Sequence, residues 1–337
     1  MLHKLDAPSR GWDRDRGSSI LVEGSSTSTR PLVSSLHAIL PRLEVGRPII
    51  LSGDPALSLM EMGLPVDGPA ALGRLPRDQP DVVVEHYDME VASRVDVLCA
   101  LTADTTPHTL GQIGMAFRAA AVTRTAVELA HDATQRAGRA VAVAGLIGSR
   151  QPRSIALDRL MEESVTHAAR LAAAGCEVLI VRGFSSATLI RRTRAAAVVG
   201  ATATRLSTWA VVEVDASIAR RDGKPIEACV TEAINSGAEA VLLDVADADM
   251  GLRAIERATN AFDEGRIGLV LAAPAPAPAA TRREDSAEAW AREAKRLVDA
   301  GARVIGGGAG TTPHHTTALA QLLGRASQSS MWPRAAG

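Results

Sequence analysis

The sequence predicts an α/β protein, and more narrowly a (β/α)8 TIM barrel with an irregular N-terminal extension. From residue 47 onward, short apolar runs alternate with longer amphipathic stretches. Each run is almost continuously apolar, as are the strands of a parallel sheet that is covered on both faces. Eight such units in 337 residues favour a closed barrel, which typically takes about 250 residues. Ser52–Pro55, after the first run, is not a dinucleotide-binding fingerprint, which disfavours an open doubly wound sheet.

The chain divides into an N-terminal extension (1–46), the barrel (47–325) and a C-terminal tail (326–337). We expect the extension to be irregular because it is rich in Ser, Arg and Asp and includes the low-complexity run Gly24–Thr29. The expected strands are Pro48–Leu51, Val95–Leu101, Ala140–Ala144, Glu177–Val181, Trp209–Val214, Ala240–Leu243, Ile267–Leu271 and Arg303–Ile305. The expected helices include Gly111–Arg136, Ile155–Ala174, Pro225–Ser236, Leu252–Glu264, Ser286–Ala300 and a last one that begins at Thr312-Pro313.

The helix ends support this alternation. Three of the helices end in a glycine just before the next strand, at Gly175, Gly237 and Gly301. A glycine there supplies the left-handed residue that stops a helix and turns the chain. The Pro-Ala run Ala273–Ala280 is compatible with neither a helix nor an inner strand, so we expect an extended loop after the seventh strand.

Composition restricts the class of protein. The net charge of −1 gives no basic footprint for nucleic acid, and no run of 18 apolar residues predicts a membrane span. The charged, polar N-terminus does not resemble a signal peptide. Three cysteines, Cys99, Cys176 and Cys229, fit a reducing compartment without disulfides. We therefore expect a cytoplasmic protein with a small-molecule substrate and with neither a nucleic-acid nor a membrane partner; a homo-oligomer remains open.

The most informative segment is Arg303–Leu319, RVIGGGAGTTPHHTTAL, which predicts a strand, a glycine turn and a helix. It resembles the closing motif of the homocysteine S-methyltransferase family, Gly-Gly-Cys-Cys-Gly-Thr-Thr-Pro. Weaker similarities follow in the family's order, and together they cover residues 48–323 and imply the family's barrel. They lie at Pro48–Gly63, Pro80–Thr102, Val143–Gly148 and Asp222–Val230.

The resemblance also shows where the chain departs from the family. In the family three cysteines hold a catalytic zinc that activates a thiol; the matching positions are Val245, Gly308 and Ala309. The family's glutamate after the fourth strand, which holds the substrate's amino group, matches Arg182, and its opening Asp-Gly-Gly matches Ser52–Asp54. Without soft ligands a sulfur-rich zinc site is not available. We therefore expect no metal ligands and no cofactor, and predict that cysteine-bound zinc is absent.

Other chemistry is expected at the C-terminal ends of the strands, where barrel enzymes place their sites. A guanidinium at Arg182 can clamp a carboxylate or phosphate, or form a structural pair with an aspartate that fills the vacated site. Asp244, on the strand itself, must be paired or functional because burying it alone is costly. The catalytic candidates are Asp244, Arg182, Glu213 and His108. The substrate-binding candidates are Ser52, Gly53, Asp54, Thr102, Asp215, Gly307, Gly308 and Thr311.

Two of these assignments have a structural alternative. Asp244, Asp247 and Asp249 have a spacing that suits a hard cation such as Mg²⁺, but Asp247 or Asp249 also suits the cap of the helix that follows. His108, in the loop after the second strand, is placed to act as a general base, or is a plain loop residue.

Three functions fit the sequence. The first is a divergent homocysteine S-methyltransferase-like enzyme without the thiolate zinc site, acting on a small amino-acid-like or anionic substrate. The second is a noncatalytic binding or scaffold subunit with a decayed site. The third still transfers a methyl group, but involves a substrate that needs no zinc-activated thiol. A fold alone does not decide among them.

Overall fold

The computed structural model describes residues 34–148, 156–203, 206–220, 222–260, 266–274 and 283–325. Most of the extension and the C-terminal tail therefore lie outside the described residues, as does nearly all of the Pro-Ala run. The described segments belong to one unit, residues 33–337.

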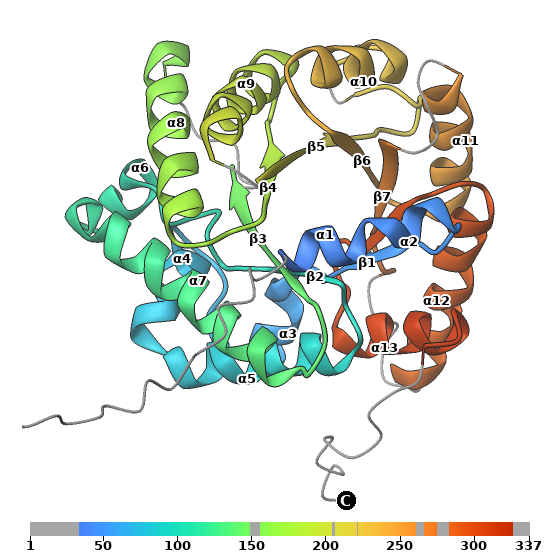
Figure 1. The fold of residues 1–337 in the computed structure, drawn as a ribbon, viewed down its shortest axis with the longest axis horizontal. Helices are drawn as coiled ribbons and strands as arrows, with labels where there is room; N and C mark the ends of the chain where they lie inside the picture. Colours follow the sequence, from blue (N-terminus) through green and yellow to red (C-terminus); the bar gives the residue numbers. More distant parts are fainter. Residues whose placement is uncertain are drawn as a thin grey trace, which may run out of the picture. The chain divides into compact units, whose positions relative to one another are not determined.

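Eight parallel strands close into a barrel in chain order, as the sequence predicts (Figure 1). Each strand pairs with the next along the chain, and the first pairs with the last through Ile49 and Val304. The observed strands begin or end within three residues of the expected ones. They are β1 (Ile49–Leu51), β2 (Val97–Cys99), β3 (Ala142–Ile147), β4 (Val178–Arg182), β5 (Ser207–Glu213), β6 (Ala240–Val245), β7 (Ile267–Leu271) and β8 (Val304–Gly307).

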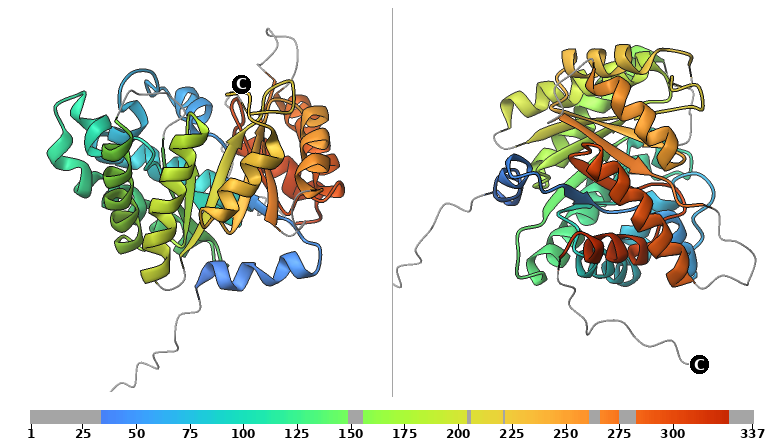
Figure 2. Two further views of the ribbon diagram at one scale, coloured as in Figure 1. Left: turned by 90° about the horizontal axis from the view of Figure 1, so that it is seen from above. Right: turned by 90° about the vertical axis from the view of Figure 1, so that its right-hand side faces the viewer.

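Helices surround the strands, as two perpendicular views show (Figure 2). The described helices between β1 and β4 are α3 (Pro55–Glu61), α4 (Ala71–Asp78), α5 (Pro80–Ala92), α6 (Pro107–Gly111), the short 3-10 helix η1 (Ala116–Arg118), α7 (Ala119–Arg136) and α8 (Leu157–Ala173). Those after β4 are α9 (Ser186–Thr202), α10 (Ile226–Asn235), α11 (Ala248–Thr259), α12 (Arg283–Asp299) and α13 (Pro313–Leu322). None of these helices has the length and apolarity needed to cross a membrane.

The core has two layers because successive strand residues point to opposite faces. One set packs outward against the helices. The other fills the interior of the barrel with aliphatic side chains and one tryptophan, Trp209. This inner layer makes the barrel a packed body without an open channel, so a ligand can bind only at its ends.

The last part of the predicted extension is not irregular. Residues Ser35–Ile39 and Pro41–Glu44 form helices α1 and α2, which lie across the N-terminal end of the barrel (Figure 2). Leu36 and Ile39 are buried and join the inner apolar cluster. The hydroxyl of Ser34 and the amide of Leu36 donate to the carboxylate of Glu177, which immediately precedes β4. Helices α1 and α2 therefore cover the bottom of the barrel.

Candidate functional site

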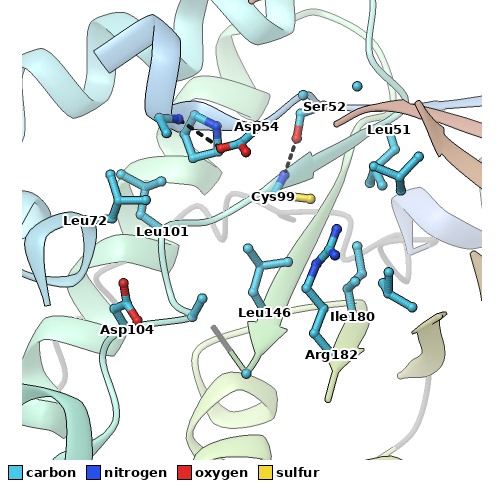
Figure 3. A pocket seen from close by; sticks show the side chains of 18 of the residues that line it. Leu51, Ser52, Asp54, Leu72, Cys99, Leu101, Asp104, Leu146, Ile180 and Arg182 are labelled. Atoms are coloured by element: carbon cyan, nitrogen blue, oxygen red, sulfur yellow. Dashed lines mark hydrogen bonds between the residues drawn. The ribbon is translucent and has the colours of Figure 1, made fainter. Parts of the chain in front are cut away.

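A pocket of about 300 Å³ opens at the C-terminal ends of the barrel strands (Figure 3), and each of the eight strands contributes to its lining. Its walls come from the strand ends, from the start of α3 and from the loop between α3 and α4. Five of the predicted site residues line it: Ser52, Gly53, Asp54, Arg182 and Gly307.

Three neighbouring strands place a charged side chain above the apolar interior. Arg182 on β4, Glu213 on β5 and Asp244 on β6 each stand two positions after an inward-facing residue of the inner cluster. Because side chains alternate along a strand, all three point inward. The register pairs Glu213 directly with Asp244. The structure thus brings three of the four predicted catalytic residues together.

Arg182 and Asp244 form an ion pair. The Nη1 atom of Arg182 donates to Oδ2 of Asp244 at 2.5 Å, and each side chain is 15% exposed. The backbone of Arg182 is also fixed, because Arg192 of α9 donates to its carbonyl oxygen at 2.7 Å. The guanidinium is therefore both paired and positioned at the edge of the pocket.

The glycine turn after β8 meets the end of β1. The hydroxyl of Thr311 donates to the carbonyl of Gly308 at 2.7 Å and accepts from the amide of Asp54 at 3.3 Å. A Cβ at Gly307 would lie 2.4 Å from Thr311 Oγ1, and one at Gly53 would lie 2.8 Å from the same atom. Only glycines allow this approach, so the turn shapes the wall of the pocket through its backbone.

The remaining candidates lie outside the pocket. Thr102 is fully buried and accepts from the amide of Leu146 at 2.7 Å, so it joins the ends of β2 and β3. Asp215 accepts from the hydroxyl and amide of Ser217, and these hydrogen bonds hold its pKa below the usual value. His108 lies within α6 and does not line the pocket.

Asp247 caps a helix. Its side chain accepts from the amide of Met250 at 2.7 Å at the start of α11, which begins at Ala248, four residues before the expected start. The helix cap is the alternative to a cation site that the spacing of Asp244, Asp247 and Asp249 also allowed.

Among the lining residues that sequence reasoning did not select are Cys99 and Asp67. Cys99 is the last residue of β2, and the period of two that places Val97 inside the barrel could have placed Cys99 there as well. Burial raises the pKa of its thiol to about 12, so it is not a thiolate near neutral pH. Asp67 belongs to the loop between α3 and α4, whose approach to the strand ends no local pattern signals.

Opposite charges lie on opposite sides of the pocket. In Figure 3, Asp54 and Asp104 lie on the other side of the pocket from Arg182, and the apolar side chain of Leu146 lies between Arg182 and Asp104. Asp67 adds a third carboxylate to the lining. One cation and several carboxylates separated by an apolar surface are suited to a small molecule that carries both charges.

No cysteine stands at the three positions that the sequence resemblance matches to the family's zinc ligands. The positions that match the zinc ligands of the family are Val245, Gly308 and Ala309, and none of these side chains carries a ligand atom. Among the described residues there is also no cluster of three or more His, Cys, Asp or Glu side chains that could hold a metal ion.

Similar folds occur among solved structures. The metallated form of the homocysteine methyltransferase MmuM from Escherichia coli superposes with a TM-score of 0.70 at 18% identity, covering 86% of this chain and 100% of that one. Its apo form gives a TM-score of 0.63, also at 18% identity and 86% coverage of this chain, with 99% of that chain covered. At this identity the likeness shows the fold alone.

Sequence comparison identifies the family. No curated protein matches the chain. Residues 56–323, well over half of the chain, match the sequence model of the homocysteine S-methyltransferase family. This match includes every strand from β2 to β8 and the glycine turn before α13. The chain therefore belongs to the homocysteine S-methyltransferase family.

Proposed function

We propose that the protein is a methyltransferase-like enzyme that binds a small amino-acid-like substrate at the C-terminal mouth of the barrel without cysteine-bound zinc. Membership of the homocysteine S-methyltransferase family supports the methyltransferase-like function. The observation that carries the finer proposal is the position of Arg182, which stands at the pocket where the family's substrate-binding glutamate is expected.

The charge at this position decides which end of the substrate is held there. A carboxylate would attract an ammonium group, whereas the guanidinium of Arg182 donates hydrogen bonds to a carboxylate. Asp54 and Asp67 in the same lining supply the negative charge for an ammonium group. The substrate is therefore oriented with its carboxylate toward β4 and its amino group toward β1.

The reaction proceeds without a zinc-activated thiolate. The positions for the zinc ligands carry Val245, Gly308 and Ala309, and the thiol of Cys99 has a pKa of about 12. We assign to Asp244 the task of holding the guanidinium of Arg182 in place. To Glu213, its neighbour on β5, we assign removal of a proton from the acceptor.

Three related ligands test the binding mode. Isothermal titration compares L-methionine with its methyl ester, which lacks the carboxylate charge, and with 3-(methylthio)propionate, which lacks the ammonium group. We expect L-methionine to bind best, because only it satisfies both ends of the pocket. Equal affinity for the ester, or no binding of any of the three, would contradict the proposal.

A further inference from the structure

The opposite end of the barrel holds a second and larger cavity, of about 640 Å³. It lies where β1, β2 and β3 begin, next to α2 and the end of α13, and is therefore remote from the pocket that Figure 3 shows. Five arginines and two aspartates line it, so its formal charge is three positive. The charged lining residues are Arg42, Arg47, Arg94, Arg139, Arg325, Asp96 and Asp299.

Asp96 neutralises only part of this charge. It is 1% exposed, and its carboxylate forms ion pairs with Arg42 and, at 2.6 Å, with Arg325. Asp299 is 61% exposed and pairs with Lys295 of α12. Both carboxylates of the lining therefore already form ion pairs with basic side chains.

The arginines lie close enough to repel one another. The pKa of Arg139 is lowered to about 10, chiefly by burial; Asp96 opposes the fall, and the neighbouring charges of Arg94, Arg325 and Arg42 add to it. Cations gathered in a concave site raise the local potential for an anion.

Arg94 has a buried polar atom without a partner. Its Nε atom is buried and has no hydrogen-bond partner, which is costly for a charged group. Its backbone is also left-handed, with φ of 70°, at the C-terminal end of α5, where glycine is the usual residue. The strained backbone does not favour an arginine at this position, so the residue is explained by what its side chain binds.

We propose that this cavity binds a small, soluble phosphorylated anion through the guanidinium groups of Arg94, Arg47 and their neighbours. Guanidinium groups match phosphate oxygens with paired hydrogen bonds, and a compact anion of two or more negative charges offsets the excess of the lining. The lining contains no aromatic side chain for stacking a base, which favours the phosphate group as the recognised part.

Pyrophosphate is the probe for a titration at constant ionic strength, with chloride as the balancing anion. Wild-type protein is expected to bind it saturably at one site. Arg94→Gly is expected to weaken binding about tenfold or more, because a charge-assisted contact is lost. Its melting temperature without pyrophosphate should be unchanged or higher, because glycine relieves the backbone strain. Arg47→Gln should weaken binding without affecting the fold.

Two control variants separate this site from others. Arg124→Gln removes an exposed arginine on α7, and Arg182→Gln removes the cation of the pocket at the C-terminal ends of the strands. Both variants should bind pyrophosphate like the wild type. No saturable binding by the wild type overturns the proposal, and so does unchanged affinity in both Arg94→Gly and Arg47→Gln. A parallel titration uses a short single-stranded oligonucleotide and anionic phospholipid vesicles. If only these bind, the ligand is not a small soluble phosphate and the proposal is wrong.

Discussion

Arg182 and Glu90 show how surroundings determine what a charged side chain does. Arg182 stands beside an open pocket and is paired with Asp244. Glu90 of α5 is 1% exposed, and neither of its carboxylate oxygens has a hydrogen-bond partner. Burial raises its pKa from 4.5 to about 8, while the nearby backbone N–H of Gly53 opposes the rise only in part. Glu90 is therefore protonated near neutral pH.

Arg182→Ala is expected to abolish binding of the amino-acid-like ligand while lowering the free energy of unfolding by only about 1 kcal/mol. The loss of stability is small because the side chain of Asp244 is 15% exposed beside the pocket-lining Arg182, so water can solvate it once the guanidinium is removed. Titration with L-methionine and urea denaturation of the same sample measure both effects, with Asp244→Asn as the matched variant. Retained binding together with a loss of about 3–5 kcal/mol, the cost of breaking a buried pair, would show that the pair is structural.

Glu90→Gln tests the neutral carboxyl. The unfolded chain loses this proton above about pH 4.5 and the native chain only above about pH 8. Between these values the native state binds more protons, so rising pH lowers wild-type stability by about 1.4 kcal/mol per unit. The stability of the variant relative to the wild type should increase across this window and level off above it. Urea denaturation from about pH 5 to about pH 9 measures this, with the exposed Glu162→Gln as control; a pH-independent difference would contradict it.

At the scale of elements, periodicity and chain breaks predicted the strands well. All eight were expected in the right place because buried parallel strands are nearly continuous apolar runs. Helices α1 and α2 were missed, although Leu36, Ile39, Leu40 and Leu43 have helical spacing. Short helices with little intrinsic stability form here because the barrel end buries their apolar side chains.

The turn after β8 leads to a prediction for Gly308, the position that matches one of the family's zinc-binding cysteines. A Cβ at Gly308 would lie 2.9 Å from the amide nitrogen of Ala272 and 3.0 Å from the carbonyl carbon of Leu271. Gly308→Cys should therefore lower the free energy of unfolding by about 1–3 kcal/mol, because backbone atoms must move. Ala309→Cys, at an exposed position that already has a Cβ, is the matched control. Urea denaturation compares them, and equal stability of the two variants would show that the turn adapts freely.

At the scale of the whole molecule, the barrel predicted which strand ends meet but not where the pocket opens. Arg182, Glu213 and Asp244 could be placed together because consecutive parallel strands end on the same side. One wall of the pocket is formed by the loop between α3 and α4, whose path is set by tertiary packing. Loop residues such as Asp67 were for that reason the least predictable.

The molecule as a whole is expected not to methylate homocysteine in the manner of its family. That reaction needs a thiolate, and the three positions that match the zinc ligands lack the side chains to generate one. Incubation with homocysteine and S-methylmethionine, betaine or a methylated folate should yield no methionine above a blank without protein. The E. coli MmuM enzyme serves as a positive control. Robust turnover in the presence of a metal chelator would contradict this expectation.

The pairing of β1 with β8 also has a consequence for synthesis. Ile49 leaves the ribosome long before Val304, its partner in the closed sheet. Ser34 is likewise synthesised long before its hydrogen-bond partner Glu177, which lies 143 residues later in the chain. Until then the first strand presents an unsatisfied edge, and such edges promote association between chains. Premature termination anywhere before β8 would therefore leave an aggregation-prone fragment instead of a smaller working protein.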